Sequence, residues 1–337
     1  MYQIIQEGKA RIKIAKGKIT SKLPIFYNPI MKFNRDISIL LLNSINKNNL
    51  QIALPLSGTG VRGIRFLLEL KKNKIKNISF NDNNKNFLKI IRTNLRLNKI
   101  KKKVNIFNED ANLFLLKSPG FDYIDIDPFG TPNPFLDSAI KRISRNGILA
   151  VTATDTSALC GTYINACKRK YWALPLHSEI MHEIGLRILI RKIQLIGSQY
   201  DKALLPIFSY YKDHYMRTFL YCEKGKTKVD NILKQHSHFQ NSGPLWLGNL
   251  WHTKLVNKML KNAKTKDLVK FLVIIKEESK INTVGFYDTH KLSKKIIKKD
   301  ILIKKIKSKG YKASKTHFKG EGIRSNIPRK ELIKLIQ

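Results

Sequence analysis

The sequence predicts an α/β fold with a doubly wound, Rossmann-like sheet, followed by a smaller α+β module with winged-helix-like features. Three observations support this. Short apolar strands alternate with helical patterns up to about Asp155, a glycine-rich turn joins the first strand to its helix, and the pattern changes to helices and a hairpin beyond Trp251. Because 337 residues exceed one typical domain, we expect two domains, residues 1–250 and 251–337.

The first elements read as a βαβ opening. Asp36 is a candidate N-cap for a buried helix through ISILLLNSI, and Gln51 to Leu56 form a short apolar strand. That strand runs directly into SGTGVRGIRFLLEL, a glycine-rich turn followed by helical periodicity. This order of strand, turn and helix is the one that a phosphate- or nucleotide-binding loop requires.

Four further strands are expected, each leading into polar residues. They are NISFND ending at Asp82, VNIFNEDA ending at Asp110, DYIDID before Pro128, and GILAVTAT ending near Asp155. A helix from Phe87 to Leu97 joins the first two of these strands. Because ligands bind at the carboxyl ends of parallel strands, we expect the functional residues at that edge.

The second half of the chain continues with a helix, a pair of strands and a turn-rich segment. These are HEIGLRILIRKIQLIG, then LPIFSYY with YMRTFLYCE, then the stretch that ends in GPLWLGNL. Three helical patterns follow, and a basic segment suits a β-hairpin. They are LVNKMLKNA, KDLVKFLVIIKEES, SKKIIKKDILIKKIKSKG and finally YKASKTHF with GIRSN.

The composition points to a polyanionic partner. The 64 Lys and Arg residues against 24 Asp and Glu give a formal charge of +40, and clustered basic charge binds nucleic acid by releasing counterions. Lysine-rich drift explains part of this excess, and a membrane surface is disfavoured because no basic amphipathic helix has an aromatic face. Three cysteines without CxxC spacing, and no apolar run of about 18 residues, favour a reducing, cytoplasmic setting.

Gly58, Gly60 and Gly63 form a GxGxxG motif, and Asp82 ends the next strand. Taken alone, this motif leaves three interpretations open. Nicotinamide and flavin enzymes use the same glycines and a carboxylate for ribose hydroxyls, a methyltransferase can use them too, and any α/β protein can hold a tight turn. The motif that separates them is the fourth strand.

DIDPFG places Asp127, Pro128 and Phe129 where the fourth strand ends. This trio suits a planar base that carries an amino group. The Asp127 carboxylate and the Pro128 carbonyl can accept hydrogen bonds from the amine, and Phe129 can stack on the ring. A loop with a capping Asp and a turn Pro is the structural alternative, and a dehydrogenase has no use for this arrangement.

The sequence resembles the tRNA guanine-26 dimethyltransferase family over nearly its whole length. The motifs that carry the resemblance are FYNPIMKFNRD, SGTGVRGIRF, Asn81-Asp82, EDA at 109–111, DIDPFG, VTATDTSALCG, YYKDHYMR, GPLWLG, FYDTH and THF. The resemblance implies a class I methyltransferase that transfers one or two methyl groups from S-adenosylmethionine to the exocyclic 2-amino group of guanine 26 in tRNA.

The resemblance also implies roles for particular residues. Those expected to bind S-adenosylmethionine are Arg35, Arg65, Asp82, Asp110 and Ala111, with Gly58 and Gly60 of the loop. Asp127 is the expected catalytic residue. Either Phe26 or Tyr27 is expected to be near the base, and the basic C-terminal region, with Lys312, Lys315, Lys319 and Arg324, is expected to hold tRNA phosphates.

One departure concerns metal. Relatives often carry paired cysteines before GPLWLG as a zinc site, whereas this chain has only His236 and His238 there, so we expect no metal. His182 and His214 are expected to be structural. A nicotinamide-dependent oxidoreductase, a non-catalytic RNA-binding protein, and a methyltransferase acting on another RNA or on an adenine amine remain alternatives. We expect a monomer.

Overall fold

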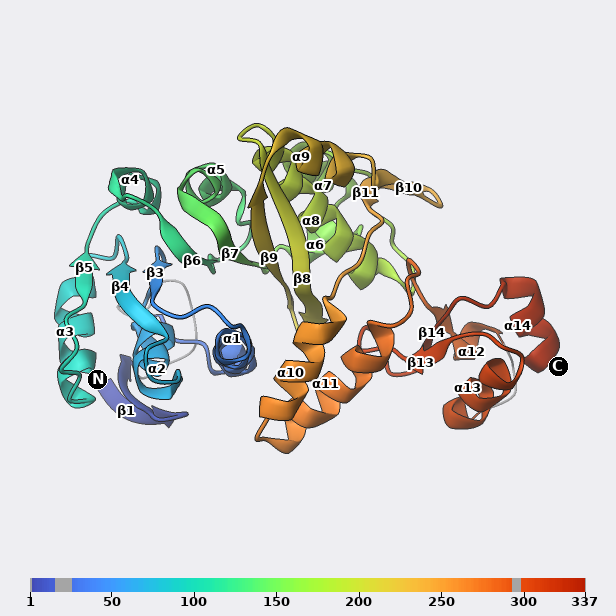
Figure 1. The fold of residues 1–337 in the computed structure, drawn as a ribbon, viewed down its shortest axis with the longest axis horizontal. Helices are drawn as coiled ribbons and strands as arrows, with labels where there is room; N and C mark the ends of the chain where they lie inside the picture. The colour runs from blue at the N-terminus through green and yellow to red at the C-terminus, as the bar shows by residue number, and fades with distance from the viewer. Residues whose placement is uncertain (1, 16–25, 293–297, 337) are drawn as a thin grey trace. The chain divides into compact units, whose positions relative to one another are not determined.

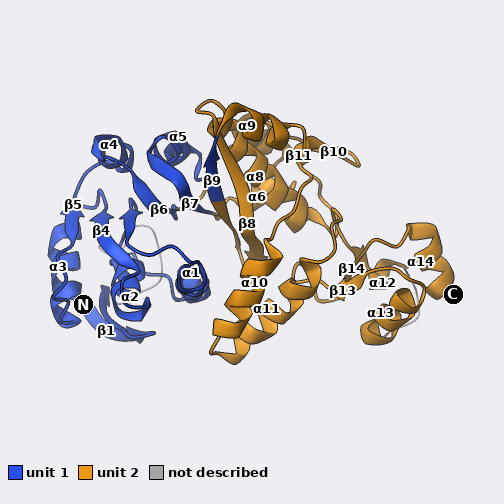
Figure 2. Ribbon diagram, viewed as in Figure 1, with its two compact units in different colours: residues 1–128, 132–151, 221–224 blue, residues 129–131, 152–220, 225–337 orange. Residues whose placement is uncertain are grey.

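The computed structural model describes residues 2–15, 26–292 and 298–336, and the chain divides into two compact units (Figures 1 and 2). Unit 1 comprises residues 1–128, 132–151 and 221–224, and unit 2 comprises residues 129–131, 152–220 and 225–337. The unit boundaries differ from the predicted division at residue 250, because residues 152–220 pack in the same unit as the C-terminal region.

A parallel sheet forms the centre of unit 1. Its strands are β3 (Leu50–Leu54), β4 (Ile75–Asn81), β5 (Asn105–Phe107), β6 (Phe121–Ile126) and β7 (Ile143–Ala153). The pairs β4–β5, β3–β4, β3–β6 and β6–β7 are all parallel. The full order is β5-β4-β3-β6-β7-β9-β8, with β8 at Lys202–Lys212 and β9 at Tyr215–Lys224. The predicted doubly wound α/β sheet is confirmed.

Helices cover both faces of the sheet in unit 1. On one side are α1 (Lys32–Ser44), α2 (Val61–Glu69) and α3 (Phe87–Leu97), and on the other are α4 (Ala111–Lys117) and α5 (Asn133–Arg142) (Figure 1). The start of α1 was predicted too late. The side chain of Asn28 caps the short 3₁₀ helix η1 (Pro29–Met31), which leads directly into α1, so Asp36 lies inside the helix and is not its N-cap.

A hairpin that the sequence analysis did not predict begins unit 1. Its strands, β1 (Tyr2–Glu7) and β2 (Ala10–Ala15), pair antiparallel around Gly8, which has a φ of 54°. Asn94 of α3 and Asn98, which caps this helix, hold the hairpin: Asn98 Oδ1 accepts from Arg11 N at 2.8 Å, and Asn94 Oδ1 accepts from Lys13 N at 2.8 Å. The hairpin brings Glu7, at the end of β1, into the interior.

Unit 2 is built around α8 (Met181–Ser198), a helix with a largely buried surface. Other elements of unit 2 are α6 (Thr156–Leu159), α7 (Ile164–Tyr171), α9 (Lys226–Leu233), β10 (His236–Phe239), β11 (Ser242–Trp246), α10 (Thr253–Asn262) and α11 (Lys266–Glu278). The helices predicted at HEIGLRILIRKIQLIG, LVNKMLKNA and KDLVKFLVIIKEES are confirmed as α8, α10 and α11.

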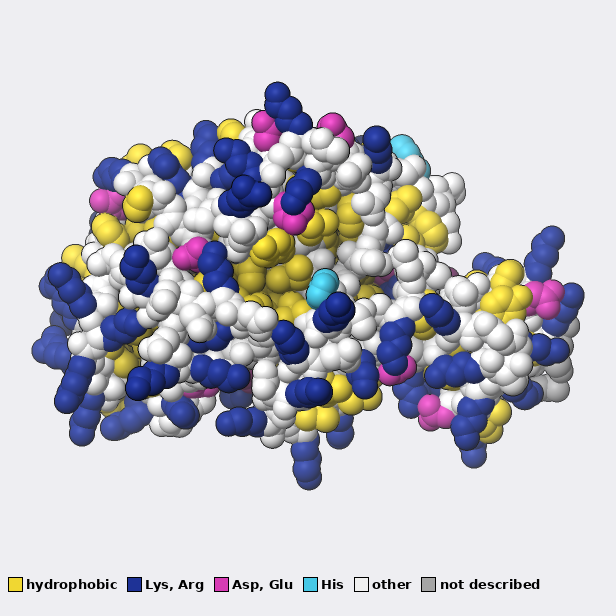
Figure 3. Space-filling model, in the orientation of Figure 1, with side chains coloured by type: hydrophobic (Ala, Val, Ile, Leu, Met, Phe, Trp, Pro, Cys, Tyr) yellow, Lys and Arg dark blue, Asp and Glu magenta, His cyan; other side chains and the backbone are white. Residues whose placement is uncertain are grey.

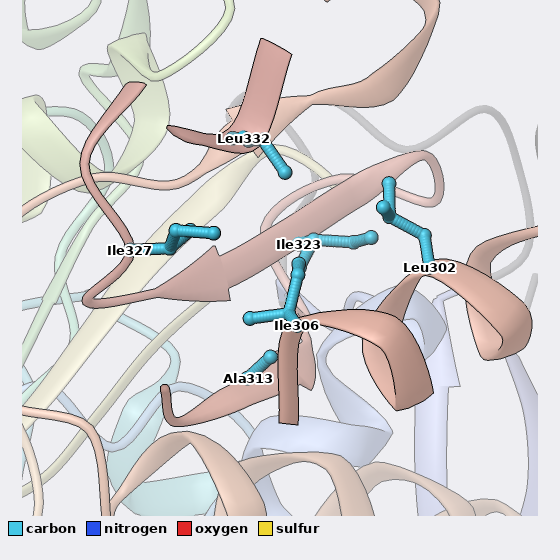
Figure 4. Packing of buried hydrophobic residues seen from close by; sticks show 6 residues of the cluster. All are labelled: Leu302, Ile306, Ala313, Ile323, Ile327 and Leu332. Atoms are coloured by element: carbon cyan, nitrogen blue, oxygen red, sulfur yellow. The ribbon is translucent and has the colours of Figure 1, made fainter. Parts of the chain in front are cut away.

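The C-terminal part of unit 2 combines a small antiparallel sheet with short helices. The sheet has the order β12-β14-β13, with β12 at Tyr287–Asp288, β13 at Ala313–Lys315 and β14 at Gly322–Ser325. The helices are α12 (Thr289–Leu292), α13 (Lys299–Ser308) and α14 (Arg329–Ile336). Apolar side chains from α13, α14 and the sheet form one core (Figure 4). The predicted hairpin is confirmed, while the predicted helix at 293–310 lies partly outside the described residues.

Candidate active site

The glycine loop between β3 and α2 has the backbone that the sequence motif predicts. Gly58 and Gly60 have φ values of 52° and 78°, in the left-handed region that side chains disfavour. A Cβ on Gly60 would lie 2.2 Å from Ile91 Cδ1, so a larger residue here would displace the end of this side chain of α3. The helix that follows begins without a side-chain cap, which leaves its first N–H groups for a ligand.

Asp82 comes after β4, the strand next to β3, and Asp110 comes after β5, the strand beyond it. Asp82 Oδ2 accepts from Gly58 N at 2.8 Å, and Asp110 Oδ1 caps α4 by accepting from Asn112 N at 2.9 Å. Asn81, to which sequence reasoning gave no role, donates to Pro55 O at 3.0 Å and to Glu109 O at 3.1 Å. Asn81 thus joins the ends of three adjacent strands, and Ala111 begins α4 beside them.

Arg35 is buried in an ion pair with Glu7. The exposed fractions of the two residues are 5% and 2%, and Arg35 Nε donates to Glu7 Oε1 at 2.7 Å. Tyr27 Oη donates to the other oxygen of Glu7 at 2.7 Å. Burial raises the pKa of Glu7, but the hydrogen bonds and charge of Arg35, helped by Tyr27 and Arg65, outweigh it and lower the pKa from 4.5 to about 2.

Arg65 contacts three carboxylates at once. It donates to Glu7 Oε1 at 2.9 Å and to Glu69 Oε1 at 2.7 Å, and it pairs with Asp36 Oδ1 at 2.6 Å. Only 3% of Arg65 is exposed. These contacts join the hairpin, α1 and α2, so Arg65 holds the wall of the site together through its protein partners. Glu7, which recruits both arginines, is a residue that sequence reasoning missed.

Asp127 directly follows β6 and is held by Arg62 of α2. Arg62 Nη2 donates to Asp127 Oδ2, and Arg62 Nη1 lies 3.4 Å from Asp125 Oδ2. Two residues of α1 anchor the same guanidinium, because Nη1 also donates to Asn34 Oδ1 at 3.0 Å and to Ser38 Oγ at 2.9 Å. Among the described residues, Asp127 Oδ1 has no hydrogen-bond partner. Sequence reasoning missed Arg62, although it lies within the glycine motif.

The residues after Asp127 form an open turn. Phe129 is 59% exposed, and Gly130, with a φ of 75°, donates from its N–H to Thr154 Oγ1 at 2.7 Å. Phe26 is half-buried in unit 1, and its carbonyl would lie 3.3 Å from a Cβ on Gly58. The backbone of Phe26 therefore lies next to the glycine loop, and the stacking role of its side chain stays a prediction.

The lysines predicted to bind tRNA are on the surface, but they differ in their partners. Lys312 is exposed, Lys315 pairs with Asp300 at 2.9 Å, and Lys319 pairs with Asp288 at 2.7 Å. Among the charged side chains of the face seen in Figure 3, Lys and Arg far exceed Asp and Glu. Lys312 is the one of these three that carries its charge without a described ion pair.

Arg324 does not have the surface position expected of a phosphate contact. It is 0% exposed, and its guanidinium pairs with Glu183 at 2.6 Å and with Glu278 at 3.1 Å. Arg187 completes the network by donating to Glu183 at 2.9 Å. The predicted contact between Arg324 and tRNA is therefore wrong, because moving Arg324 to the surface would deprive two buried carboxylates of this partner.

The histidines considered as functional residues have other surroundings. His182 stacks on Tyr211 with ring centroids 3.8 Å apart, and burial lowers its pKa to about 4. His214 is exposed, which does not suit the structural role expected of it. His236 shares a hydrogen bond of 2.8 Å with Gln194. In the described parts of the chain, no group of three or more His, Cys, Asp or Glu side chains could hold a metal ion, and no helix is long and apolar enough to cross a membrane.

The site has the donors and acceptors that an adenosyl cofactor needs. Asp82 and Asp110 place carboxylates at adjacent strand ends, and a carboxylate can accept hydrogen bonds from hydroxyl and amino groups. The uncapped N-terminus of α2 and the glycine loop let the backbone come close to a ligand without a steric penalty. These features fit S-adenosylmethionine, and they do so with residues of unit 1 alone.

Comparisons with known proteins agree with this reading. A family model described as N2,N2-dimethylguanosine tRNA methyltransferase matches residues 8–241 and 233–337. A tRNA (guanine(26)-N(2)/guanine(27)-N(2))-dimethyltransferase of Aquifex aeolicus is 37% identical to this chain in sequence. The match covers 99% of this chain and 96% of the length of that protein. A tRNA (guanine(26)-N(2))-dimethyltransferase of Pyrococcus furiosus is 38% identical, over 99% of this chain and 98% of its own.

A solved structure of a similar protein matches this chain over nearly its full length. Trm1 from Pyrococcus horikoshii, in complex with S-adenosyl-L-methionine, superposes with a TM-score of 0.91 and 35% identity, covering 99% of this chain and 100% of that one. Neither a nicotinamide-dependent oxidoreductase nor a non-catalytic RNA-binding protein accounts for these full-length matches. The chain belongs to the N2,N2-dimethylguanosine tRNA methyltransferase family.

Proposed function

We propose that this protein transfers one or two methyl groups from S-adenosylmethionine to the exocyclic 2-amino group of guanine 26 in tRNA. The observation that carries the proposal is Asp127, fixed by Arg62 through one carboxylate oxygen at the edge where Asp82 and Asp110 also lie. Family membership supplies the substrate class, and the formal charge of +40 suits a polyanion. Action as a monomer in the cytoplasm stays a prediction from sequence.

The residues of unit 1 divide the work of holding the cofactor. Asp82 suits the ribose hydroxyls, Asp110 with the backbone of Ala111 suits the adenine edge, and Gly58 and Gly60 give close backbone access. When bound, S-adenosylmethionine supplies a methyl group already activated by its sulfonium. Arg35 is the arginine we propose for the methionine carboxylate, and Arg65 supports the pocket through Glu7 and Asp36.

The target guanine must leave the base stack to reach these residues. Its amino group is a poor nucleophile because the nitrogen lone pair is delocalised into the ring, so placement provides most of the catalysis. We assign Asp127 and the Pro128 carbonyl as acceptors for the amine and Phe129, 59% exposed, as a stacking partner. Phe26 is a second stacking candidate.

Arg62 acts as a positioning residue for Asp127. Because it occupies Oδ2, it leaves Oδ1 for the amino group of guanine, and its bonds to Asn34 and Ser38 fix its own orientation. A hydrogen bond from the amine to Asp127 favours rehybridisation of the nitrogen. After transfer, the nitrogen carries one proton too many, and Asp127 accepts it directly or through water.

The basic surface of unit 2 is proposed to hold the tRNA backbone. Lys312, Lys315 and Lys319 are exposed or half-buried, and cations of this kind position a nucleic acid without reading its sequence. Lys312 should contribute most, because Lys315 and Lys319 already neutralise Asp300 and Asp288.

The test uses the conservative substitution Asp127→Asn, with Asp122→Asn as the matched control. Asp122 lies on β6, the strand that Asp127 follows, but it pairs with Lys47 at 2.6 Å and accepts from Gln51 N. Transfer of labelled methyl to an unmodified tRNA transcript should fall by about 10²- to 10⁴-fold in Asp127→Asn, while its affinity for S-adenosylmethionine and the activity of Asp122→Asn should be retained.

The substrate arm compares this transcript with one in which guanine 26 is replaced by adenine. Label in the first transcript only supports both the reaction and the position. Equal label in both transcripts contradicts the position, and normal turnover by Asp127→Asn contradicts the catalytic assignment. Label that appears only in the adenine transcript would favour the alternative of an adenine amine.

A further inference from the structure

Trp172 is an exposed tryptophan held in an unusual backbone conformation. It caps the C-terminus of α7 with a φ of 55° and a ψ of 41°, the left-handed region that non-glycine residues rarely adopt. It is 51% exposed, whereas Trp246 and Trp251, the other two tryptophans of the chain, are 2% and 6% exposed. A large aromatic ring facing water at a strained position points to a use outside the core.

One face of the Trp172 ring is already occupied. Lys192 of α8 reaches over the ring, with Nζ 2.8 Å from the ring centroid, and Lys192 itself is only 6% exposed. Burial, together with the charge of Arg191, lowers the pKa of Lys192 to about 8. The cation beneath the ring fixes its orientation, so the exposed part of Trp172 is a rigid, flat surface.

The surroundings of the ring are positively charged. Arg191 donates from Nη1 to Trp172 O at 3.2 Å, and its Nε is buried without a described partner. The last turn of α7 adds three exposed basic residues, Lys168, Arg169 and Lys170, of which Lys170 pairs with Asp155 at 2.9 Å. Among the described contacts, no carboxylate pairs with Arg191 or Lys192.

We propose that Trp172 is a stacking platform for an unpaired nucleotide of tRNA, with Arg191 and the basic turn of α7 contacting the flanking phosphates. An aromatic surface among cations is the combination with which proteins bind single-stranded nucleic acid, since every base offers a flat face and every nucleotide a phosphate. Paired bases hide their faces in the stack, so the nucleotide is an unpaired one. The inference rests on the proposed tRNA substrate, and it adds a contact in unit 2 outside the catalytic residues.

Intrinsic fluorescence tests the contact directly. Because Trp246 and Trp251 are buried, a base that stacks on Trp172 should quench the solvent-accessible part of the emission. We expect an unmodified tRNA transcript to quench the wild-type protein and to leave the Trp172→Phe variant nearly unquenched. Equal quenching of both proteins would overturn the proposal, and this readout does not depend on methyl transfer.

Affinity provides the second test. Base stacking on an aromatic side chain is worth about 1–3 kcal/mol, so Trp172→Ala should weaken tRNA binding by about 5- to 150-fold. Trp172→Phe should keep most of the affinity. The control is Tyr2→Ala in unit 1, because Tyr2 is also exposed, at 47%, and carries Lys13 over its ring.

The outcomes separate this inference from the proposed function. Unchanged tRNA affinity in Trp172→Ala, or an equal loss in Tyr2→Ala, would refute the platform even if guanine 26 is methylated normally. The wild-type protein could bind tRNA as proposed but leave guanine 26 unmethylated. In that case, quenching of the wild type together with a loss of tRNA affinity in Trp172→Ala would support the platform and contradict the proposed reaction. If Trp172→Ala does not fold, the quenching comparison with Trp172→Phe decides.

Discussion

Replacing Glu7 by Gln should cost a large share of the stability of unit 1. Glu7 is 2% exposed and accepts hydrogen bonds from Arg35, Arg65 and Tyr27. Its pKa is lowered from 4.5 to about 2, a difference of about 2.5 units, which at about 1.36 kcal/mol per unit gives about 3 kcal/mol at neutral pH. This value agrees with the cost of about 3–5 kcal/mol that is usual when one partner of a buried ion pair is removed.

The control is Glu69→Gln, because Glu69 also contacts Arg65 but is less buried. The exposed fraction of its side chain is 15%, and Arg65 would keep Glu7 and Asp36. We expect it to cost about 1 kcal/mol. The assay is urea unfolding at pH 7, followed by far-ultraviolet circular dichroism.

The dependence on pH adds a second signature. The folded-state pKa of Glu7 lies below its unfolded value, so its contribution is complete above about pH 4.5 and is lost as the pH falls toward 2. Glu7→Gln should therefore approach the wild type in stability as acid is added through this window. A free energy of unfolding within about 1 kcal/mol of wild type at pH 7, or an equal loss in Glu69→Gln, would refute the reasoning.

Two further predictions concern other buried contacts. Ser38→Ala removes a hydrogen bond of 2.9 Å to Arg62, so it should lower kcat by about fivefold and leave the affinity for the cofactor unchanged. The control is Ser44→Ala, because Ser44 is also a buried serine of α1 but donates to Leu40 O, and its kcat should stay at the wild-type value. Equal kcat values for the two variants would contradict the role of Arg62. Burial raises the pKa of Glu278, but His317 and Arg324 lower it to about 2, so Glu278→Gln should destabilise unit 2 most above about pH 4.5. Thermal unfolding from about pH 7 to about pH 3 measures this. A difference in stability between the variant and the wild type that stays constant as the pH falls would contradict it.

The sequence predicted the parts of the fold that repeat a local pattern. The strand before Gly58, the loop and α2 follow from an apolar run, glycines and helical periodicity, and the structure agrees. Asp82 and Asp110 could be placed at one edge because parallel strands end together. The start of α1 was placed too late because the short helix η1 precedes it. The side chain of Asn28, and not that of Asp36, caps this helical segment.

The rest depended on contacts between distant segments. Glu7 meets Arg35 and Arg65 only because the N-terminal hairpin folds against α3, and no local pattern connects these positions. Arg324 belongs to a strongly basic stretch, so its sequence context suggests the surface, whereas carboxylates from two distant helices enclose it. Arg62 and Arg65 lie three positions apart on one helix, and only their tertiary partners give them different roles.

The buried pairing of Arg324 with Glu183 has a consequence for how the protein is made. The two residues are 141 positions apart in the chain. During synthesis, Glu183 has Arg187 of the same helix, α8, as a partner long before the strand that brings Arg324 has been assembled. Long-range contacts of this kind are slow to form and expose apolar surface meanwhile. Unit 2 can therefore close its core only near the end of translation, and nascent chains that stop before β14 should be substrates for chaperones and proteases.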